Sequence, residues 1–357
     1  MALIVIAAGG TAGHVVPALA VADELRRRGA GVEFVGGERA EAELVPAAGY
    51  PFHRLRVAGL DRRNPLRAVR AVVLAAAATA RARRLLRRLG ADAVLGGGGY
   101  VAGPVGLAGA TLRLPLVLTE ADSHLGASNR LLAPLARRVF LSFPLPGRDG
   151  AKYVVSGRPV PPGTTTGDRA AARARFGIDP EEPCLLVFGG SLGARRLNEA
   201  AFDAFARAAP CAVLHASGRR DHAELRRRLD SLGARPHYHL HAYIEPFADA
   251  LAAADLVVAR AGGSVLELAA AGKPAILVPY PHATADHQTG NARFMAEPGA
   301  AVILPDAELE GPRLAREVAS LMGAPQRLAA MARAARELAR PDAAERIAQE
   351  TLALVAG

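Results

Sequence analysis

The sequence predicts an α/β protein built from two doubly wound, Rossmann-like domains that face a cleft. Short apolar runs alternate with amphipathic stretches along the chain, which is typical of βαβ units around a parallel sheet. The order strand, glycine-rich loop, helix occurs twice, once near residue 9 and again near residue 189. A length of 357 residues exceeds what one hydrophobic core usually supports and fits two domains.

The expected elements follow from where the apolar runs begin and end. In the first half we expect strands at Leu3–Ala8, Val32–Gly36, Ala93–Gly96 and Leu116–Thr119, and helices at Pro17–Arg28 and Pro65–Leu89. In the second half we expect strands at Cys184–Gly189, Ala212–His215, Leu256–Ala259 and Ala275–Val278, and a helix at Arg195–Ala208. The Pro-, Gly- and Thr-rich stretch Ser156–Asp168 lacks an apolar period and is typical of a linker. We therefore expect domains at 1–160 and 161–341, with a last helix within 342–357 that packs back on the first.

The cysteine content and the apolar stretches indicate in which cellular compartment the protein is expected. The two cysteines, Cys184 and Cys211, both lie in apolar runs, so they supply neither a disulfide framework nor a thiolate metal site. A reducing, cytoplasmic setting is therefore expected. The first apolar run has no basic segment before it, so no signal peptide is expected. The most apolar stretch, Ala71–Ala80, is closed by arginines and is too short to span a bilayer.

The positive charge is concentrated in the first half of the chain. The net charge is +10, and residues 1–160 carry 22 basic against 11 acidic side chains. Within them, Arg54–Arg88 contains eleven arginines and one acid, Asp61, interleaved with apolar residues. Such a surface suits an anionic membrane, although a solvated arginine-rich helix is the alternative. Aromatic residues make up only 4% and no recognition motif is present, so nucleic acid is not an expected partner.

The first glycine loop, Gly9-Gly10-Thr11-Ala12-Gly13-His14, lacks the dinucleotide spacing G-x-G-x-x-G. The expected second strand also ends in glycines instead of the acid that would bind a ribose. What remains is a backbone nest at a helix N-terminus, which binds phosphate, with Pro17 expected in the first helical turn. His14 on this loop is a candidate general base or phosphate ligand, and a cap or spacer is the alternative.

Two further clusters follow expected strands of the first half. Four consecutive glycines at 96–99 precede Tyr100, and such a run lets a backbone approach a ligand closely, so Gly98, Gly99 and Tyr100 are candidate substrate contacts. Glu120 and Asp122 come at the end of the next strand. They are candidate ligands for sugar hydroxyls, and Glu120 is a second, weaker candidate base. The alternative is that Asp122 or Ser123 caps the following helix.

The second half offers groups that suit a nucleoside diphosphate. Gly262, Gly263 and Ser264 are expected at a helix N-terminus, where free amides and the helix dipole favour a diphosphate. Glu267 in the first turn is a candidate acceptor for a ribose diol, or else only stabilises the helix dipole. Gln288 carries a donor and an acceptor for sugar hydroxyls, and Ser191 lies in a second glycine loop.

No DxD pair and no His/Cys cluster of metal-ligand spacing is evident, so catalysis without a metal or cofactor is expected. These groups together fit a nucleotide-sugar transferase in which the second domain grips a nucleoside diphosphate and the first presents an acceptor. The rival readings are an oxidoreductase that uses NAD(P), which the glycine spacing disfavours, and a basic binding module, which leaves the second-half motifs unexplained.

Five motifs in order, "GGTAGHVVPALAVA", "GGGGYVAGP", "GGSLGARRLN", "AGGSVLELAAAGKPAILVPYP" and "DHQTGNA", resemble the MurG family along nearly the whole chain. The resemblance implies the GT-B fold. It also implies an inverting transfer of N-acetylglucosamine (GlcNAc) from UDP-GlcNAc to undecaprenyl-diphospho-muramoyl-pentapeptide, by a peripheral enzyme on the cytoplasmic face of the membrane. Another GT-B enzyme acting on UDP-sugars, such as a soluble-acceptor transferase or an epimerase, is the nearest alternative.

By position, the resemblance implies roles for individual residues. His14 matches the histidine proposed to act on the acceptor, Ile244 packs near the uracil and Glu267 binds the ribose. The implied donor site comprises Thr11, Ala12, Gly13, Asp122, Ser191, Ile244, Gly262, Gly263, Ser264, Val265, Leu266, Glu267 and Gln288. The chain departs from the family pattern at Ala12, Asp122, Pro161 and Leu192, where a glycine, an asparagine, an arginine and a glutamine are usual. Arg158 is a candidate to replace the arginine that Pro161 lacks.

Overall fold

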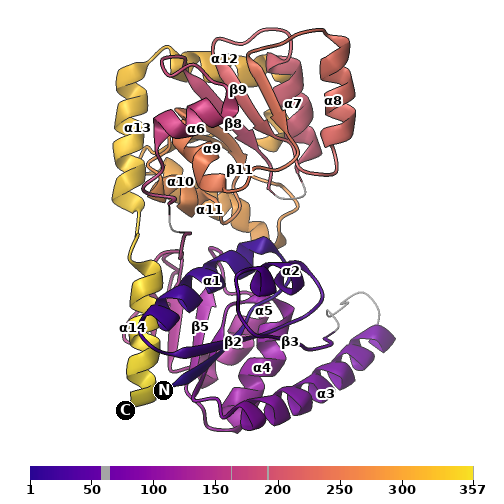
Figure 1. Ribbon diagram of the computed structural model, residues 1–357, viewed down its shortest axis with the longest axis vertical. Coiled ribbons are helices and arrows are strands. Elements are labelled where there is room, and N and C mark those ends of the chain that lie inside the picture. The colour runs from indigo at the N-terminus through magenta and orange to yellow at the C-terminus, as the bar shows by residue number, and fades with distance from the viewer. Residues whose placement is uncertain (58–64, 162, 191–192, 357) are drawn as a thin grey trace. The chain divides into compact units, whose positions relative to one another are not determined.

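The computed structural model describes residues 1–57, 65–161, 163–190 and 193–356. The chain forms two compact units (Figure 1). The first comprises Met1–Pro161 together with Arg340–Gly357, and the second comprises Pro162–Ala339. Each unit has its own parallel sheet, so each is described by itself.

The first unit contains a seven-stranded sheet in which every pairing is parallel. The strand order is β3-β2-β1-β4-β5-β6-β7. The strands are β1 (Leu3–Ala7), β2 (Gly31–Gly36), β3 (Phe52–Arg54), β4 (Ala93–Gly96), β5 (Leu116–Glu120), β6 (Arg138–Leu141) and β7 (Tyr153–Val155). The central strands are buried on both faces, which explains why they read as continuous apolar runs instead of alternating ones.

Helices cover both faces of this sheet. On one face α1 (Ala12–Arg27) packs beside α2 (Ala40–Ala47) and α14 (Ala343–Ala356), the C-terminal helix, which contributes buried Ile347 and Ala348 to the core. On the other face lie α3 (Pro65–Leu89), α4 (Gly99–Thr111) and α5 (Ala127–Leu132), followed by the short η1 (Ala133–Leu135). The C-terminal helix therefore belongs to the first unit, although the chain segments that form the second unit precede it.

Helix α1 begins five residues earlier than the sequence predicts. It starts at Ala12, so His14 lies in its first turn and not on the loop, and Pro17 lies inside the helix. A proline at this position has no N–H to donate to the carbonyl of Gly13, four residues before it. The placement of Pro17 in the first turn was wrong, because the glycine loop is shorter than its composition suggests.

The second unit contains a six-stranded parallel sheet in the order β10-β9-β8-β11-β12-β13. The strands are β8 (Cys184–Phe188), β9 (Ala212–Ala216), β10 (Tyr238–His241), β11 (Leu256–Arg260), β12 (Ala275–Val278) and β13 (Ala301–Ile303). The four strands expected from the sequence are all present, and β8, β11 and β12 are fully buried.

Eight α-helices of the described chain surround this second sheet. They are α6 (Arg169–Phe176), α7 (Arg195–Phe205), α8 (His222–Ser231), α9 (Phe247–Ala253), α10 (Val265–Ala270), α11 (His287–Ala296), α12 (Gly311–Met322) and α13 (Pro325–Leu338), with short η2 (Thr284–Asp286) and η3 (Asp306–Glu308). Helices α7, α8 and α12 share one core with the sheet. Within the described residues, no helix has the length and apolar character needed to cross a membrane.

Both sheets reverse their strand order at one point, between β1 and β4 in the first unit and between β8 and β11 in the second. Crossovers on either side of such a point leave the sheet in opposite directions, so a crevice opens at the carboxyl ends of the two strands. Four glycine-rich loops follow these four strands: Gly9–Thr11, Gly97–Gly98, Gly189–Ala194 and Ala261–Ser264. The topology therefore brings the sequence motifs together in pairs.

Candidate functional site

In the first unit, the two glycine loops lie directly against each other. A Cβ on Gly99 would stand 1.9 Å from the carbonyl oxygen of Gly9, so no other residue fits there without moving the backbone. Gly98 has a φ of +88°, and a Cβ there would lie 2.6 Å from Cδ2 of His14. The same Cβ would lie 3.3 Å from Nε2. The glycines thus allow the approach and leave the Nε2 edge of the imidazole uncovered by a side chain at position 98.

A buried carboxylate, Glu41 of α2, fixes the first loop. Its Oε2 accepts a hydrogen bond from the amide of Gly10 at 2.9 Å, and its Oε1 accepts one from the amide of Gly37 at 2.9 Å. The hydroxyl of Tyr100 donates to Oε1 at 3.1 Å. Glu41 is fully buried and joins the ends of β1 and β2 to the start of α4. No motif in the sequence marks Glu41, because its partners are backbone amides of other segments.

Two effects oppose each other at Glu41. Burial by itself raises the pKa of the carboxyl group, but the backbone amides of Gly10, Glu41 and Gly37 and the Tyr100 hydroxyl outweigh it. The pKa of Glu41 is therefore held below its ordinary value, and the group is ionised at neutral pH. Tyr100, predicted to contact the acceptor, uses its hydroxyl on Glu41, while the Arg39 guanidinium lies 5.2 Å from its ring centre.

His14 is surrounded by charges of both signs. Its Nδ1 lies 3.4 Å from Oγ1 of Thr11, the residue before α1. Burial lowers the pKa of His14 below its ordinary value. The carboxylates of Asp122 and Glu41 act in the opposite direction, and the Arg158 guanidinium adds to the lowering. The imidazole is therefore neutral at pH 7, in the state that can accept a proton.

Arg158 reaches this helix start from the linker. Its guanidinium is buried and donates through Nη2 to the carbonyl of Gly13 at 2.9 Å. That carbonyl is the one that Pro17 leaves without a helical donor, so the proline and the arginine form a complementary pair. The structure thus places Arg158 beside His14. It does not test whether Arg158 replaces the arginine that the family pattern has at position 161.

Glu120, the second candidate base, organises the loop that follows β5. Its carboxylate accepts hydrogen bonds from the amide of Gly126 at 2.8 Å, the side-chain amide of Asn129 at 2.9 Å and the amide of Asp122 at 3.2 Å. Only 4% of Glu120 is exposed, and burial raises its pKa. An acceptor that is already occupied by three donors is better suited to hold the loop than to abstract a proton.

The alternative interpretation, that Asp122 or Ser123 caps the following helix, is wrong. Helix α5 begins at Ala127, and its capping position is Gly126, which makes no side-chain hydrogen bond. The loop is long enough to carry Asp122 away from the helix, and its carboxylate instead acts on His14. This proximity keeps Asp122 among the site residues of the first unit.

In the second unit, the loop after β8 rests on the end of β9. Gly193 has a φ of +81°, and a Cβ there would lie 2.2 Å from the carbonyl oxygen of Ser217. The side-chain amide of Asn198 on α7 donates to the same carbonyl at 2.8 Å. Ser191 and Leu192, predicted in this loop, lie outside the described residues.

A buried polar network supports Asn198. Its Oδ1 lies 3.1 Å from Nε2 of His215, whose Nδ1 lies 2.7 Å from the hydroxyl of Tyr238, and its Nδ2 also donates to Asp221 at 2.9 Å. Burial lowers the pKa of His215 to about 3, so this histidine is neutral and structural. Asn198 is the last residue of the sequence motif "GGSLGARRLN", and this network explains why an asparagine occupies that position.

The turn after β11 is closed in part by its own hydrogen bonds. Helix α10 begins at Val265, but the amides of Val265 and Leu266 already donate to the carbonyls of Gly262 and Gly263, at 3.2 and 3.3 Å. Their side chains are buried in the core. These two amides are therefore used within the turn, whereas the free amides predicted from the sequence are those of Gly262, Gly263 and Ser264, and that prediction stays a prediction. Glu267, Gly262, Gly263 and Ser264 remain partly exposed.

Two other predicted donor contacts lie on neighbouring elements of the second unit. Ile244 is buried, only 3% exposed, in the segment between β10 and α9. Gln288, in the first turn of α11, accepts a hydrogen bond through Oε1 from the amide of Tyr280 at 2.9 Å. This bond fixes the orientation of the Gln288 side chain, so its Nε2 is the half available for donation to a ligand.

Two doubly wound units, each with glycine loops at its switch point, are the architecture of the GT-B class, to which many glycosyltransferases belong. Residues 4–141 match the description "Glycosyltransferase family 28 N-terminal domain" and residues 184–347 match "Glycosyltransferase family 28 C-terminal domain". The chain belongs to glycosyltransferase family 28, and within it to the MurG family. The predicted fold class and family are thereby confirmed.

The relatives match over their full length. A protein of Moorella thermoacetica named "UDP-N-acetylglucosamine--N-acetylmuramyl-(pentapeptide) pyrophosphoryl-undecaprenol N-acetylglucosamine transferase" is 43% identical, with 99% of each chain covered. One of the same name from Alkalilimnicola ehrlichii is 45% identical, with 97% of each covered. The crystal structure of Acinetobacter baumannii MurG superposes with a TM-score of 0.77 at 32% identity, covering 98% of this chain and 99% of that one.

The role of Glu41 can be tested by Glu41→Gln. Glutamine offers one acceptor oxygen where three donors converge, so we expect the free energy of unfolding to fall by about 1–3 kcal/mol at pH 7. Because the folded-state pKa of Glu41 is lowered, its contribution is present above its ordinary pKa of about 4.3 and is lost as the pH falls below that. Urea unfolding from pH 3 to 7 measures both effects.

Glu43→Gln on the exposed side of the same helix is the matched control and should change stability by less than about 0.5 kcal/mol. Equal stabilities of the two variants across this pH range would contradict the role assigned to Glu41.

Proposed function

We propose that this chain transfers GlcNAc from UDP-GlcNAc to the C4 hydroxyl of undecaprenyl-diphosphate-linked muramoyl-pentapeptide and inverts the anomeric centre. The observation that carries the proposal is the pairing of glycine loops at both switch points in a chain that is 43% identical, over its full length, to a transferase of that name. The product would be the lipid-linked disaccharide precursor of peptidoglycan.

His14 supplies the base in this proposal. In the tautomer whose Nδ1–H points to Thr11 Oγ1, Nε2 carries the lone pair on the edge that Gly98 leaves uncovered. Nε2 would take the proton of the acceptor hydroxyl while Gly98, Gly99 and the loop held by Glu41 receive the acceptor. Asp122 would stabilise the imidazolium that forms, because its carboxylate raises the proton affinity of His14.

The second unit binds the donor in this proposal. The turn at Gly262–Ser264 and the loop around Gly193 would receive the diphosphate of UDP-GlcNAc, Glu267 the ribose diol and the Ile244 segment the uracil. Gln288, fixed by Tyr280, would donate through Nε2 to a sugar hydroxyl. The acceptor oxygen then bonds to C1 of GlcNAc as the bond from C1 to the diphosphate oxygen breaks. One displacement from the opposite face gives inversion.

The lipid acceptor also requires a membrane surface, and α3 is suited to it. Ala78, Ala82 and Leu86 of α3 are buried against the sheet, whereas Arg81, Arg84, Arg87 and Arg88 are exposed on the outer side of the helix. Residues 58–64 of the basic stretch lie outside the described residues. We propose that this arginine face holds the enzyme at the anionic cytoplasmic face of the membrane as a peripheral protein.

The transfer itself is tested with UDP-GlcNAc and a short-chain lipid-linked muramoyl-pentapeptide. We expect UDP release and a disaccharide product in equal amounts, with no UDP release when the acceptor is omitted. Acceptor-independent conversion of the donor to another UDP-sugar would instead identify an epimerase.

The base assignment predicts a pH dependence. His14→Ala should lower kcat by about 10²- to 10⁴-fold and leave the KM for UDP-GlcNAc unchanged. Because the pKa of His14 is lowered, kcat should stay high at neutral pH and fall only below the ordinary histidine value of about 6.5. Asp122→Asn removes a charge that raises this pKa, so the acid limb of the kcat–pH profile should shift to lower pH. Arg158→Met removes a charge that lowers this pKa, so the acid limb should shift to higher pH.

Arg130→Met, an exposed arginine on α5, is the control and should leave the acid limb in place. An acid limb that moves in the same direction in both site variants, or in neither, would exclude His14 as the titrating base.

Membrane binding is tested with vesicles of phosphatidylcholine with and without phosphatidylglycerol. Reversing Arg84, Arg87 and Arg88 to glutamate should weaken binding to the anionic vesicles by at least about fivefold per arginine, and added salt should weaken binding of the unaltered chain. Reversing Arg207, Arg227 and Arg316, exposed arginines of the second unit, serves as the control. Equal loss in the two triple variants would reject α3 as the docking face.

A further inference from the structure

A second pocket lies at the amino ends of the strands of the second sheet, on the edge opposite to the glycine loops. Pro183, Asp255 and Pro274, which immediately precede β8, β11 and β12, all line it. Its volume is about 440 Å³, within the range of small-molecule sites. We call it the basal pocket. It is lined by Arg169, Lys273 and Arg336, by Asp255 and Glu181, and by apolar residues of α12 and α13.

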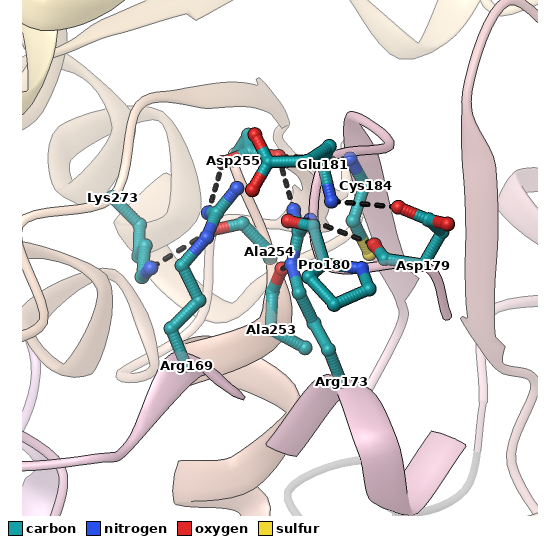
Figure 2. Close-up of polar contacts among 10 residues, drawn as sticks. All are labelled: Arg169, Arg173, Asp179, Pro180, Glu181, Cys184, Ala253, Ala254, Asp255 and Lys273. Carbon is teal, nitrogen blue, oxygen red and sulfur yellow. Dashed lines mark hydrogen bonds and ion pairs between the residues drawn. The ribbon is translucent and has the colours of Figure 1, made fainter. Parts of the chain in front are cut away.

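Lys273 is set into this pocket by the turn that ends α10. Gly272 adopts a φ of +62°, and a Cβ there would lie 2.7 Å from Nη1 of Arg336, so glycine lets the arginine lie across the turn. The ammonium group of Lys273 donates to the carbonyl of Ala254 at 2.8 Å (Figure 2). The chain has 42 arginines and only two lysines, Lys273 and Lys152. A lysine in this pocket is therefore an exception to the strong preference of this chain for arginine over lysine.

The nearby carboxylate of Asp255 already has several hydrogen-bond and ion-pair partners within the protein. It accepts hydrogen bonds from the Cys184 amide at 2.9 Å and from Nη2 of the fully buried Arg173 at 2.7 Å, and it pairs with Arg169 (Figure 2). Arg173 is held in turn by the carbonyl of Ala253 at 3.2 Å. Burial lowers the pKa of Lys273 to about 8. Asp255 opposes this lowering, and Arg169 adds to it.

The charge of the pocket is accordingly positive. Three cationic side chains line it against two carboxylates, and Arg173 lies directly behind Asp255. Arg336 is exposed on α13, and its side chain lies over Gly272 at the rim of the pocket, where its guanidinium can meet a ligand. The lining also contains apolar residues of α12 and α13, namely Met322, Leu328 and Ala332. A ligand that combines an anionic group with an apolar organic part matches this combination of cationic and apolar lining residues.

We propose that the basal pocket is a binding site for small organic phosphates, separate from the donor and acceptor sites. Arg336 and Arg169 receive the phosphate, the α12–α13 wall contacts the organic body, and the Lys273 amine lies beside the ligand. Phosphate is favoured over a carboxylate because its second charge and third oxygen match the several donors of two guanidinium groups and an amine. A divalent cation is disfavoured by the same excess of positive charge.

Pyridoxal 5′-phosphate is a suitable probe because it combines a phosphate, an aromatic body and an amine-reactive aldehyde. The neutral amine of Lys273 adds to the aldehyde carbon, a C=N bond forms, and the carbonyl oxygen leaves as water. Added borohydride then delivers hydride to that carbon and makes the bond permanent. Peptide mapping separates Lys273 from Lys152, which lies in the first unit and serves as an internal reference.

We expect the ratio of the labelling rates, pyridoxal phosphate over pyridoxal, to be at least about tenfold higher at Lys273 than at Lys152, because Lys152 reports the difference in free aldehyde between the two reagents. Arg336→Gln should abolish this preference, and Arg333→Gln, an exposed arginine of the same helix outside the pocket lining, should keep it. Phenyl phosphate should protect Lys273 at a lower concentration than inorganic phosphate.

Three results would overturn the proposal. One is a ratio of pyridoxal phosphate to pyridoxal labelling that is no higher at Lys273 than at Lys152, or no labelling of Lys273 by either reagent. Another is a preference that survives Arg336→Gln, because the phosphate would then bind elsewhere. The third is equal protection by phenyl phosphate and inorganic phosphate, which would leave no role for the apolar wall.

Discussion

The hydrogen bonds from the amides of Gly10 and Gly37 to the buried carboxylate of Glu41 hold the first site together. Glycine loops have no side chains of their own with which to fix a shape, so they depend on partners from other elements. One carboxylate ties the ends of two strands to Tyr100 on α4. The position of His14 against Gly98 follows from that arrangement, because the loop and the helix start are continuous.

The second unit meets the same requirement with a backbone carbonyl and a side-chain amide. The carbonyl of Ser217 supports Gly193, and Asn198 holds that carbonyl from α7. Behind Asn198 stand His215 and Tyr238, buried and uncharged. Asn198 also donates to the buried carboxylate of Asp221, so an acidic side chain stands behind the support in this unit too. The two units thus share a topology but differ in the group that contacts the loop directly, a carboxylate in the first and a backbone carbonyl in the second.

Much of the fold could be predicted from the sequence, because buried parallel strands are continuous apolar runs and each switch-point loop is rich in glycine. The short edge strands β3, β7, β10 and β13 escaped prediction, since three or four half-buried residues leave little pattern. Glu41 escaped for another reason, and so did the contact with Gly13 that Arg158, named from the sequence on other grounds, makes in the structure. Each side chain acts through a backbone group of a distant segment, Gly10 in one case and Gly13 in the other, and no local spacing records such a contact. The predicted site residues remain predictions, whereas the family and the transferase class are established.

The return of α14 to the first unit has a consequence for synthesis on the ribosome. Ile347 and Ala348 belong to the core beside α1, and Glu350 pairs with Arg138 of β6 at 3.2 Å. The second unit, by contrast, is one continuous stretch of chain. It can therefore fold as soon as it has emerged, while the first unit, made earlier, waits with an uncovered apolar face on α1 until its last helix is translated.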